Sequence, residues 1–278
     1  MTLFLGSAKG LVGSACYWNR FFIEGGRLAS LLYDEDNKEA DPMEMFGDFE
    51  SETGQIAKFS ATGVDIAYCE NPPVVKDQNI DLARGEIVAL IGESGCGKST
   101  MTESFAGLRR ANAGTFTASL ENGETREFPQ APAFLGAFVE QQPYLFVGSI
   151  RDNITLGAAS ISDDEVWSAL EEVGLEKMIQ HRGGLDHFLT DRGRNLSVGQ
   201  QYRLALCRAL VYGRPFLLMD EPFAALDIES ADLVVKAMQK EKARGTGILL
   251  ITHLLPENLD ADRKLFKSKN LLCVRHAP

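Results

Sequence analysis

The chain of 278 residues is poor in basic side chains, with 28 Lys and Arg against 39 Asp and Glu and a net charge of −11. Broad nucleic-acid binding needs a basic face, so this balance argues against a nucleic-acid partner. No stretch offers 18 consecutive uncharged apolar residues, so no complete membrane span is visible. The N-terminus does not resemble a cleaved signal peptide, because Lys9 interrupts its apolar stretch and no clear small-residue cleavage site follows.

Cysteine and histidine are also scarce. The five cysteines are odd in number and form no C-x-x-C pair, which suggests neither a disulfide framework nor a zinc site and fits a reducing compartment. Three of the four histidines follow no pattern, and we interpret them as surface or structural residues: His181, His187 and His276. The hydrophobic content of 45% is ordinary for a globular protein and can supply a full core.

Charge and hydropathy divide the chain into three regions. Residues 1–32 are apolar and small, and they form either an amphipathic helix lying on its own domain or the cytoplasmic end of a membrane helix. Residues 33–57 are strongly acidic and are predicted to form an extended linker, because charge of one sign resists collapse. A globular domain is expected over 58–278, with a helical subdomain at about 142–212.

Periodicity predicts both strands and helices in this domain. Residues 115–128 alternate around Asn122-Gly123 as a hairpin with a type I′ turn. Ser162 and Glu165 form a capping-box pattern at a helix start, and a second helix is expected after Ser197. The apolar runs at 216–219 and 247–251 are typical of strands buried on both faces. Together these elements predict an α/β core with an antiparallel β subdomain and a helical subdomain.

A glycine-rich segment at 92–100 has the pattern G-x-x-x-x-G-K-S between an apolar run and a predicted helix, which is the context of a phosphate-binding loop. Glycines let successive N–H groups turn toward phosphate oxygens, and the helix N-terminus adds partial positive charge. Lys98 would reach the β- and γ-phosphates, and Ser99 would ligate Mg²⁺. The alternative is a glycine-rich turn that binds nothing. The predicted nucleotide-binding residues of the loop are Gly92, Glu93, Ser94, Gly95, Cys96, Gly97, Lys98, Ser99 and Thr100.

Cys96 lies inside this loop, beside a helix start and near Lys98. Both surroundings favour the thiolate, so we expect a reactive sulfur that bound ATP would shield. The alternative is that Cys96 is only a small filler.

A phosphate-binding loop alone fits kinases, GTPases and many ATPases, but the motifs after it narrow the choice. Leu196-Ser197-Val198-Gly199-Gln200 resembles the L-S-G-G-Q signature of ABC (ATP-binding cassette) ATPases, with Val198 in place of glycine. The run 216–222, which contains Asp220 and Glu221, resembles the family's Walker B strand and the glutamate after it. Ala224-Ala225-Leu226-Asp227 is similar to the D-loop.

Three single residues complete the resemblance, which covers about residues 58–265. Gln141 falls where the family has its Q-loop glutamine, His253 matches the switch histidine, and Tyr68 stands upstream of the loop where the adenine-stacking aromatic belongs. The resemblance implies a P-loop NTPase fold of the ABC-ATPase type.

Finer features resemble the exporter branch of that family. They are the segment 144–154 after the Q-loop, Asp191-Arg192-Gly193 before the signature, and the tail at 27–34. Val198 is reminiscent of bacterial cysteine/glutathione exporters. An exporter half would carry six membrane helices upstream, and the family's last helix is short here. We therefore expect either that the membrane part is a separate polypeptide or that the chain is a fragment.

The resemblance implies ATP and Mg²⁺ as ligands and assigns roles to residues. Mg²⁺ would be held by Ser99, Gln141 and Asp220, and Glu221 would act as the general base. Lys98 and His253 would contact the phosphates. Tyr68 would stack on adenine, with core packing as the alternative.

The signature is expected to serve a second ABC ATPase subunit, identical or not, so that two chains enclose two ATP molecules. This assigns nucleotide contacts to Ser197, Gly199, Gln200 and Asp227. A transmembrane permease is the other expected partner, which places the chain on the cytoplasmic face of a membrane. The rival interpretations are a soluble ABC ATPase outside transport and a non-catalytic regulatory cassette.

Overall fold

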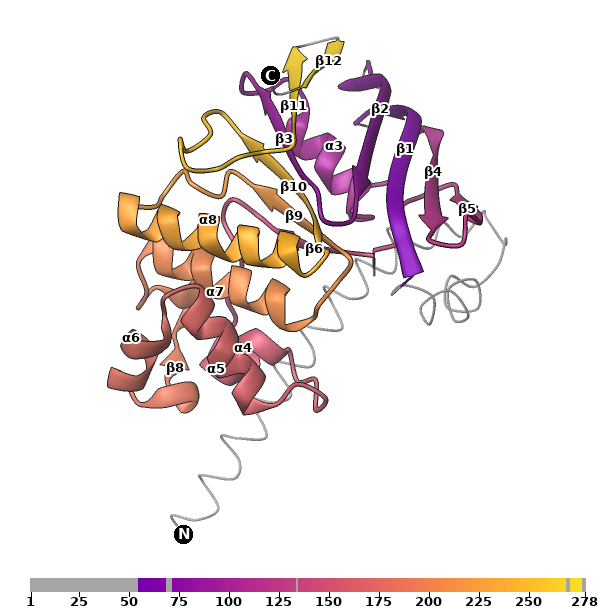
Figure 1. Ribbon diagram of the computed structural model, residues 1–278. Helices are drawn as coiled ribbons and strands as arrows, with labels where there is room; N and C mark the ends of the chain where they lie inside the picture. Colours follow the sequence, from indigo (N-terminus) through magenta and orange to yellow (C-terminus); the bar gives the residue numbers. More distant parts are fainter. Residues whose placement is uncertain (1–54, 69–71, 134, 269–270, 277–278) are drawn as a thin grey trace. The chain divides into compact units, whose positions relative to one another are not determined.

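The structure is a computed structural model that describes residues 55–68, 72–133, 135–268 and 271–276 (Figure 1). The predicted helix at 1–32 and almost all of the predicted linker at 33–57 lie outside these residues. The first described strand begins at Ile56, two residues inside the expected linker. The domain boundaries therefore stay a prediction.

The strands form three sheets. A four-stranded sheet has the order β2-β1-β4-β5, a six-stranded sheet has the order β12-β11-β3-β10-β9-β6, and β7 pairs with β8. The strands are β1 Ile56–Ile66, β2 Val75–Ala83, β3 Ile87–Gly92, β4 Ala113–Leu120, β5 Thr125–Phe128, β6 Gly136–Val139, β7 Gly148–Ser149, β8 Phe188–Leu189, β9 Phe216–Asp220, β10 Gly247–Thr252, β11 Arg263–Ser268 and β12 Leu271–His276.

The helices lie mainly in the second half of the chain. Figure 1 shows α4 to α8 gathered on one side of the molecule and the strands of the four-stranded sheet on the other. The α-helices are α3 Lys98–Phe105, α4 Ile150–Thr155, α5 Asp163–Glu172, α6 Glu176–His181, α7 Val198–Val211 and α8 Ile228–Ala243, and the 3₁₀ turns are η2 Gly184–Asp186 and η3 Asp191–Gly193. None of the helices in the described ranges combines the length and the hydropathy that crossing a bilayer requires.

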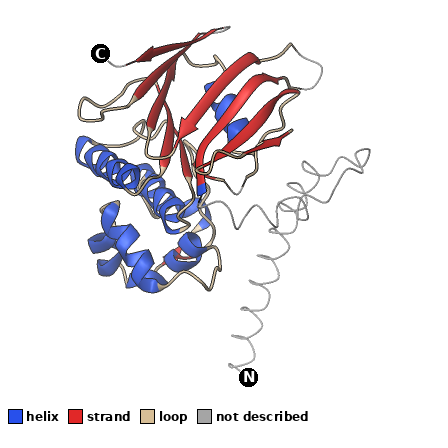
Figure 2. Ribbon diagram, turned by 45° about the vertical axis from the view of Figure 1, so that its right-hand side comes forward, coloured by secondary structure: helices blue, strands red, loops and turns tan. Residues whose placement is uncertain are grey.

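The six-stranded sheet is the centre of the domain (Figure 2). Its strands β11, β3, β10, β9 and β6 pair in parallel, and β12 adds an antiparallel edge. Every residue of β9 and β10 is buried, which confirms the prediction for the two apolar runs. Because the strands are parallel, the carboxyl ends of β3, β9 and β10 meet at one edge, where open α/β sheets place their ligands.

Helix α3 joins the two larger sheets. It contacts β1 of the antiparallel sheet and both β9 and β10 of the parallel sheet. An aromatic cluster lies between α3 and the two sheets. The centroid of the Phe59 ring is 4.7 Å from that of Phe105 on α3. It is 6.2 Å from the centroid of Phe116 on β4 and 6.1 Å from that of Phe216 on β9. Burial of these rings fixes the helix that follows the predicted phosphate-binding loop against both sheets.

The hairpin of β4 and β5 is present as predicted, but its turn is not type I′. That turn needs a positive φ at both central residues, and here only Gly123 has one, at 87°. Leu120 and Glu124 close the loop instead, with the N–H of Leu120 donating to the carbonyl of Glu124. The arrangement is a three-residue loop with glycine in the left-handed position, and the sequence Asn122-Gly123 is compatible with this loop as well.

Capping boxes begin three helices of the helical subdomain. The hydroxyl oxygens of Ser149, Ser162 and Ser197 each accept a hydrogen bond from the backbone N–H three residues later. The side chain of that later residue in turn accepts from the serine's own backbone N–H. This confirms the predicted starts of α5 and α7. Gly174, at a φ of 66°, follows α5 in the left-handed conformation that ends many helices.

Candidate functional site

The loop between β3 and α3 has the geometry of an anion-binding turn. Gly97 precedes the helix at a φ of 88°, and no side chain caps the helix N-terminus. The first N–H groups of a helix have no partner within it, so they are available to an anion. Gly92 is required for a different reason, since a Cβ there would lie 2.2 Å from the carbonyl oxygen of Lys267 on β11.

Lys98 is buried and folded back on its own loop. Its Nζ donates to the carbonyl oxygens of Gly92, at 2.7 Å, and Glu93, at 2.9 Å. These bonds hold a positive charge at the centre of the loop, where the sequence predicts phosphate contacts.

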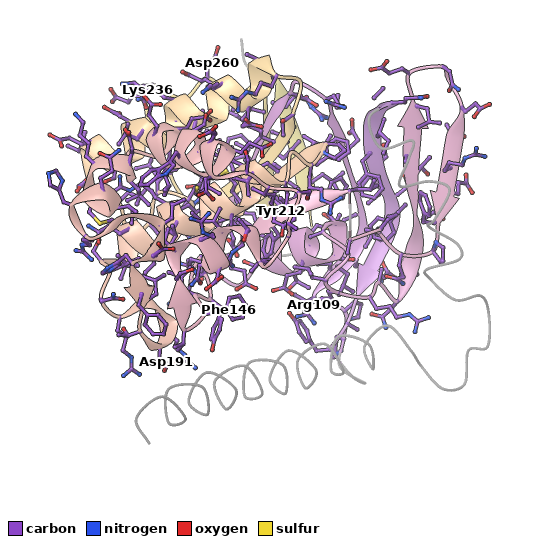
Figure 3. All side chains as sticks on the ribbon, turned by 90° about the horizontal axis from the view of Figure 1, so that it is seen from below. Arg109, Phe146, Asp191, Tyr212, Lys236 and Asp260 are labelled. Carbon is purple, nitrogen blue, oxygen red and sulfur yellow. The ribbon has the colours of Figure 1, made fainter. Side chains whose placement is uncertain are left out.

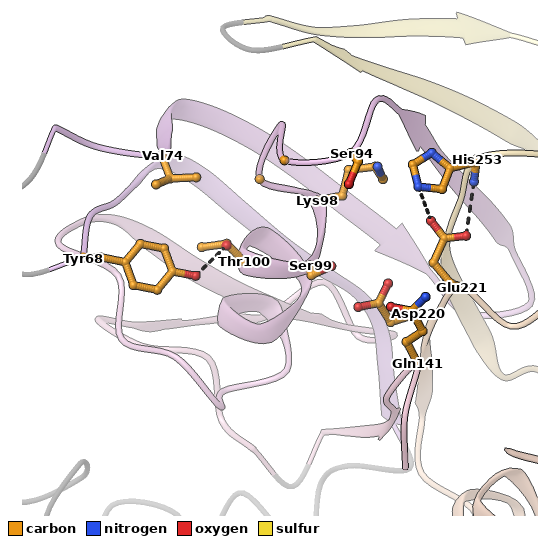
Figure 4. Close-up of a pocket in the computed structure, with 12 residues that line it drawn as sticks. Tyr68, Val74, Ser94, Lys98, Ser99, Thr100, Gln141, Asp220, Glu221 and His253 are labelled. Carbon is orange, nitrogen blue, oxygen red and sulfur yellow. Dashed lines mark hydrogen bonds and ion pairs between the residues drawn. The ribbon is translucent and has the colours of Figure 1, made fainter. Parts of the chain in front are cut away.

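A cleft of about 340 Å³ opens in front of this loop (Figure 4). It is large enough for a small ligand, and its polar groups converge from the loop and from three strand ends. Its lining residues are Tyr68, Val74, Ser94, Gly95, Gly97, Lys98, Ser99, Thr100, Gln141, Asp220, Glu221 and His253. The structure therefore brings together the predicted metal ligands, the predicted base and most of the predicted phosphate contacts.

Asp220 ends β9 and is almost fully buried. Burial raises the pKa of its carboxyl, and the charge of Glu103 on α3 raises it further. A hydrogen bond from Ser99 and the charges of Lys98 and His253 oppose this rise. The net effect of these groups is a raised pKa for the Asp220 carboxyl.

Glu221 follows in a strained conformation, with a φ of 47°. This backbone turn aims its side chain at His253, which comes directly after β10. The Nε2 atom of His253 lies 3.0 Å from Oε1 of Glu221, and the backbone N–H of His253 donates to Oε2 at 3.3 Å. Figure 4 shows both contacts at the edge of the cleft next to Asp220.

Tyr68 closes the opposite end of the cleft. Its hydroxyl is 2.9 Å from that of Thr100, and the guanidinium of Arg109 lies 4.5 Å from its ring centroid. Tyr68 is 40% exposed, so it is not a packed core residue, which was the alternative interpretation.

The signature residues lie elsewhere. Ser197 and Gln200 cap α7, while Asp227 caps α8 by accepting from the N–H of Ser230 at 2.7 Å. Gly199 is close to the D-loop, since a Cβ there would meet the carbonyl oxygen of Ala225 at 3.2 Å. None of these four predicted contacts lines the cleft.

Sequence reasoning missed two residues of the site. Val74 lines the cleft together with Tyr68. It directly follows Pro72-Pro73, and these two prolines, which interrupt the strand pattern, could have indicated the position. Arg109 is the second, and no pattern in the sequence indicates that it stacks on Tyr68. The structure also buries Cys96 to 2% exposure, so a bulky reagent does not reach its sulfur without a shift of the loop.

A parallel sheet with a glycine-rich loop at its carboxyl edge, an attached antiparallel sheet and a helical subdomain define a P-loop ATPase of the ABC type. Residues 75–224 match the family model described as ABC transporter. The chain belongs to this family.

Proteins with similar sequences are also members of the ABC transporter family. The chain is 32% identical over 198 residues to an uncharacterized ABC transporter ATP-binding protein of Haemophilus influenzae, covering 70% of this chain and 35% of that protein. It is 29% identical to the glutathione/L-cysteine transport system ATP-binding/permease protein CydC of Escherichia coli, covering 83% of this chain and 40% of the relative. The chain thus spans little more than a third of the length of such relatives.

A solved structure is also similar. A bacterial Atm1-family ABC exporter with ATP bound superposes with a TM-score of 0.71 and 25% sequence identity, covering 78% of this chain and 38% of the other.

Proposed function

We propose that this chain binds Mg²⁺–ATP in the cleft and hydrolyses it as the ATP-driven unit of an ABC exporter. The observation that carries the proposal is the contact between Glu221 and His253 at the edge of a cleft that also contains Lys98 and Asp220. The names of the relatives, which include an exporter and a transport system, support an exporter over a soluble ABC ATPase.

The residues present fit Mg²⁺. Ser99, Gln141 and Asp220 offer only oxygen donors, which are the ligands of this hard cation, and all three line the cleft. When bound, Mg²⁺ would neutralise charge on the phosphate oxygens. In the described ranges, no cluster of three or more His, Cys, Asp or Glu side chains forms a metal cage. Mg²⁺ that arrives with a nucleotide needs few protein ligands.

The side chains divide the chemical work. The loop amides and Lys98 bind the phosphates, which would replace the carbonyls of Gly92 and Glu93 as partners of the Lys98 ammonium. Glu221 orients a water molecule and accepts its proton on a carboxylate oxygen. His253 holds that carboxylate in place through its ring and its backbone N–H. Tyr68 presents its ring to adenine.

A second copy or a related chain would complete the site. Ser197, Gly199 and Gln200 lie at an exposed helix N-terminus and outside the cleft of their own chain, which supports a role toward a partner's nucleotide. Large apolar side chains next to these residues in the sequence are exposed: Val198 by 54%, and Ile228, which follows Asp227, by 83%. Leu254, which follows His253 of the cleft, is 80% exposed. Exposed apolar groups around polar contacts are typical of a surface that another chain covers.

A transmembrane domain is the second proposed partner. A cleft of about 460 Å³ with a mainly apolar lining lies beside the segment that follows Gln141, and Phe146 and Pro143 are among its lining residues. Figure 3 shows Phe146 at this face of the molecule. An apolar groove accepts the apolar face of a helix, so a helix from a membrane domain would dock here and place the chain on the cytoplasmic face.

The test is Glu221→Gln, which removes the carboxylate and keeps its size. We expect ATP turnover to fall by roughly 100-fold or more while ATP binding persists. Size-exclusion chromatography with ATP and Mg²⁺ should show a larger species for this variant. Glu127→Gln, an exposed acid on β5, is the matched control and should behave as the wild type. Hydrolysis by Glu221→Gln at a rate near wild type would exclude Glu221 as the base.

A further inference from the structure

Tyr68, which we propose as the platform for adenine, lies beyond the sheet that precedes it. Strand β1 ends at Ile66, two residues earlier, and the side chain of Tyr68 is 40% exposed. Strand pairing therefore does not set the direction of its ring. A side chain at such a position loses rotamer freedom when a ligand binds, unless contacts within the protein already hold it in the bound orientation.

The first turn of α3 provides one such contact. The hydroxyl of Tyr68 lies 2.9 Å from that of Thr100, the third residue of the helix (Figure 4). Thr100 also lines the nucleotide cleft. One hydrogen bond at the rim of a ring fixes the position of that rim, but it does not fix the tilt of the ring plane.

Arg109, which follows α3, contacts the face of the same ring. Its guanidinium carbon lies 4.5 Å from the centroid of the Tyr68 ring. A cation within about 6 Å of the centroid is attracted by the negative face of an aromatic ring. The guanidinium is planar and keeps its charge, so it stacks on the ring and restricts the tilt that the hydroxyl contact leaves open.

Glu103 of α3 anchors Arg109 in this position. Its Oε2 accepts from Nε of Arg109 at 2.6 Å, and the two side chains are only 30% and 31% exposed. The carbonyl oxygen of Glu103 also accepts from the backbone N–H of Arg109, at 3.2 Å. The backbone and the side chain of Arg109 are therefore both attached to one residue of the helix, and the side-chain bond is of the stronger, charge-assisted kind.

We propose that Arg109 is a positioning residue for the base of the bound nucleotide. Tyr68 lines the cleft and Arg109 does not, so the guanidinium supports the ring from behind while the base stacks on it from the cleft. Cation, ring and base then form three layers. The proposal rests on the proposed function, because it assumes that a nucleotide binds in this cleft with its base on Tyr68.

Helix α3 gains a second role from this arrangement. It begins in the phosphate-binding loop at Lys98, and its residues Thr100 and Glu103 hold Tyr68 directly and through Arg109. One rigid element therefore sets the distance between the site for the phosphates and the platform for the base.

The test separates the base from the phosphates. Arg109→Gln is made in the full chain together with Glu221→Gln, which prevents hydrolysis. Calorimetric titration with Mg²⁺ present then compares ATP with inorganic tripolyphosphate, which has no base. We expect the affinity for ATP to fall by roughly threefold to fivefold, the range that a cation on an aromatic face contributes. The affinity for tripolyphosphate should stay equal to that of the parent, because this ligand has no group to stack on Tyr68.

Arg110→Gln is the matched control, because it removes the same charge from the next residue, which is exposed. This variant should leave both affinities unchanged. Equal affinities of the Arg109→Gln variant and its parent for ATP would overturn the proposal. An equal loss for ATP and tripolyphosphate would also overturn it, since Arg109 would then act on the fold or on the phosphates. Failure of the parent itself to bind ATP would instead overturn the proposed function.

A double-mutant cycle tests whether Arg109 acts through the ring of Tyr68. Tyr68→Ala removes the ring, so adding Arg109→Gln to it should cause no further loss of ATP affinity. If Arg109 contacted the nucleotide directly, its replacement would weaken ATP binding as much in the Tyr68→Ala background as in the parent. That result would show that Arg109 is not a positioning residue.

Discussion

The residues of the nucleotide cleft are held by backbone conformations that few side chains tolerate. Glu221 has a φ of 47°, in the left-handed region where a residue other than glycine costs about 1–3 kcal/mol. The two bonds from His253 hold the glutamate in this state. Strain of this kind at a strand end is consistent with the catalytic role that we propose for Glu221.

Gly92 offers a sharper test at the same scale. Gly92→Ala would place a Cβ 2.2 Å from the carbonyl oxygen of Lys267, so β3 or β11 must shift. We expect the free energy of unfolding to fall by about 3 kcal/mol, measured by urea denaturation. Gly95→Ala is the control. A Cβ at position 95 meets nothing within 4 Å. The only cost of that substitution is the positive φ of 75° for a residue with a side chain, which lowers the free energy of unfolding by about 1 kcal/mol. A loss for Gly92→Ala no larger than that for Gly95→Ala would contradict the close approach.

Single residues were predictable from sequence where a local pattern determines them. The loop glycines and Lys98 follow from chain-local geometry, and the structure places Gly95, Gly97 and Lys98 at the cleft. The stacking of Arg109 on Tyr68 was not predictable, because it depends on how the segment after α3 packs. Cys96 was expected to be reactive from its neighbours in sequence, but packing buries its sulfur.

At the scale of elements, helix starts are decided by short-range hydrogen bonds. The capping box of α5 shows this, because Glu165 accepts from the backbone N–H of Ser162 at 2.7 Å and from its hydroxyl at 2.7 Å. These bonds hold the pKa of the Glu165 carboxyl below its ordinary value of 4.5. The pattern lies within four residues, so the sequence alone could predict it.

This box predicts a pH dependence. A carboxyl whose pKa is lowered by folding contributes stability above its unfolded pKa, and that contribution is lost as the pH falls through the folded value. Glu165→Ala should therefore lower the urea midpoint at pH 7, and its difference from wild type should shrink as the pH drops below 4.5. Glu171→Ala, an exposed acid of the same helix, is the control. A difference that stays constant down to pH 3 would show that the carboxylate does not act through the cap.

The hairpin turn shows the limit of short patterns. Asn122-Gly123 predicted the hairpin, but not the turn type, because the closing pair at Leu120 and Glu124 is set by strand register. Register depends on β1, which pairs with β4 from far along the chain.

At the scale of the whole molecule, long-range contacts decide the architecture. The Asp262 side chain accepts a hydrogen bond from the N–H of Ile87, and Arg263 forms ion pairs with Asp81 and Glu86. These contacts join the start of β11 to residues in and between β2 and β3 that are about 180 positions earlier in the chain. Local patterns could predict strands and helices here. The family resemblance implied the fold class, but the order of the strands and the place of α3 between two sheets were not predicted, because no local pattern encodes them.

The proposed two-chain site predicts a dependence on protein concentration. Since the signature residues lie outside the cleft of their own chain, hydrolysis per chain should rise with protein concentration as dimers form. Steady-state ATPase assays over a hundredfold range of concentration would measure this, with sedimentation giving the dimer fraction. Substantial hydrolysis at a constant rate per chain, by a protein that sediments as a monomer, would contradict the two-chain site.

Strand β10 has a consequence for measurement. All its residues are buried, and it is paired on one side with β3 and on the other with β9. Its amide hydrogens should therefore exchange with D₂O only when the whole domain opens, so their exchange rate reports the global free energy. A bound nucleotide would slow that exchange by the factor 1 + [L]/Kd. The amides of one strand thus become an internal gauge of nucleotide affinity that needs neither turnover nor a label.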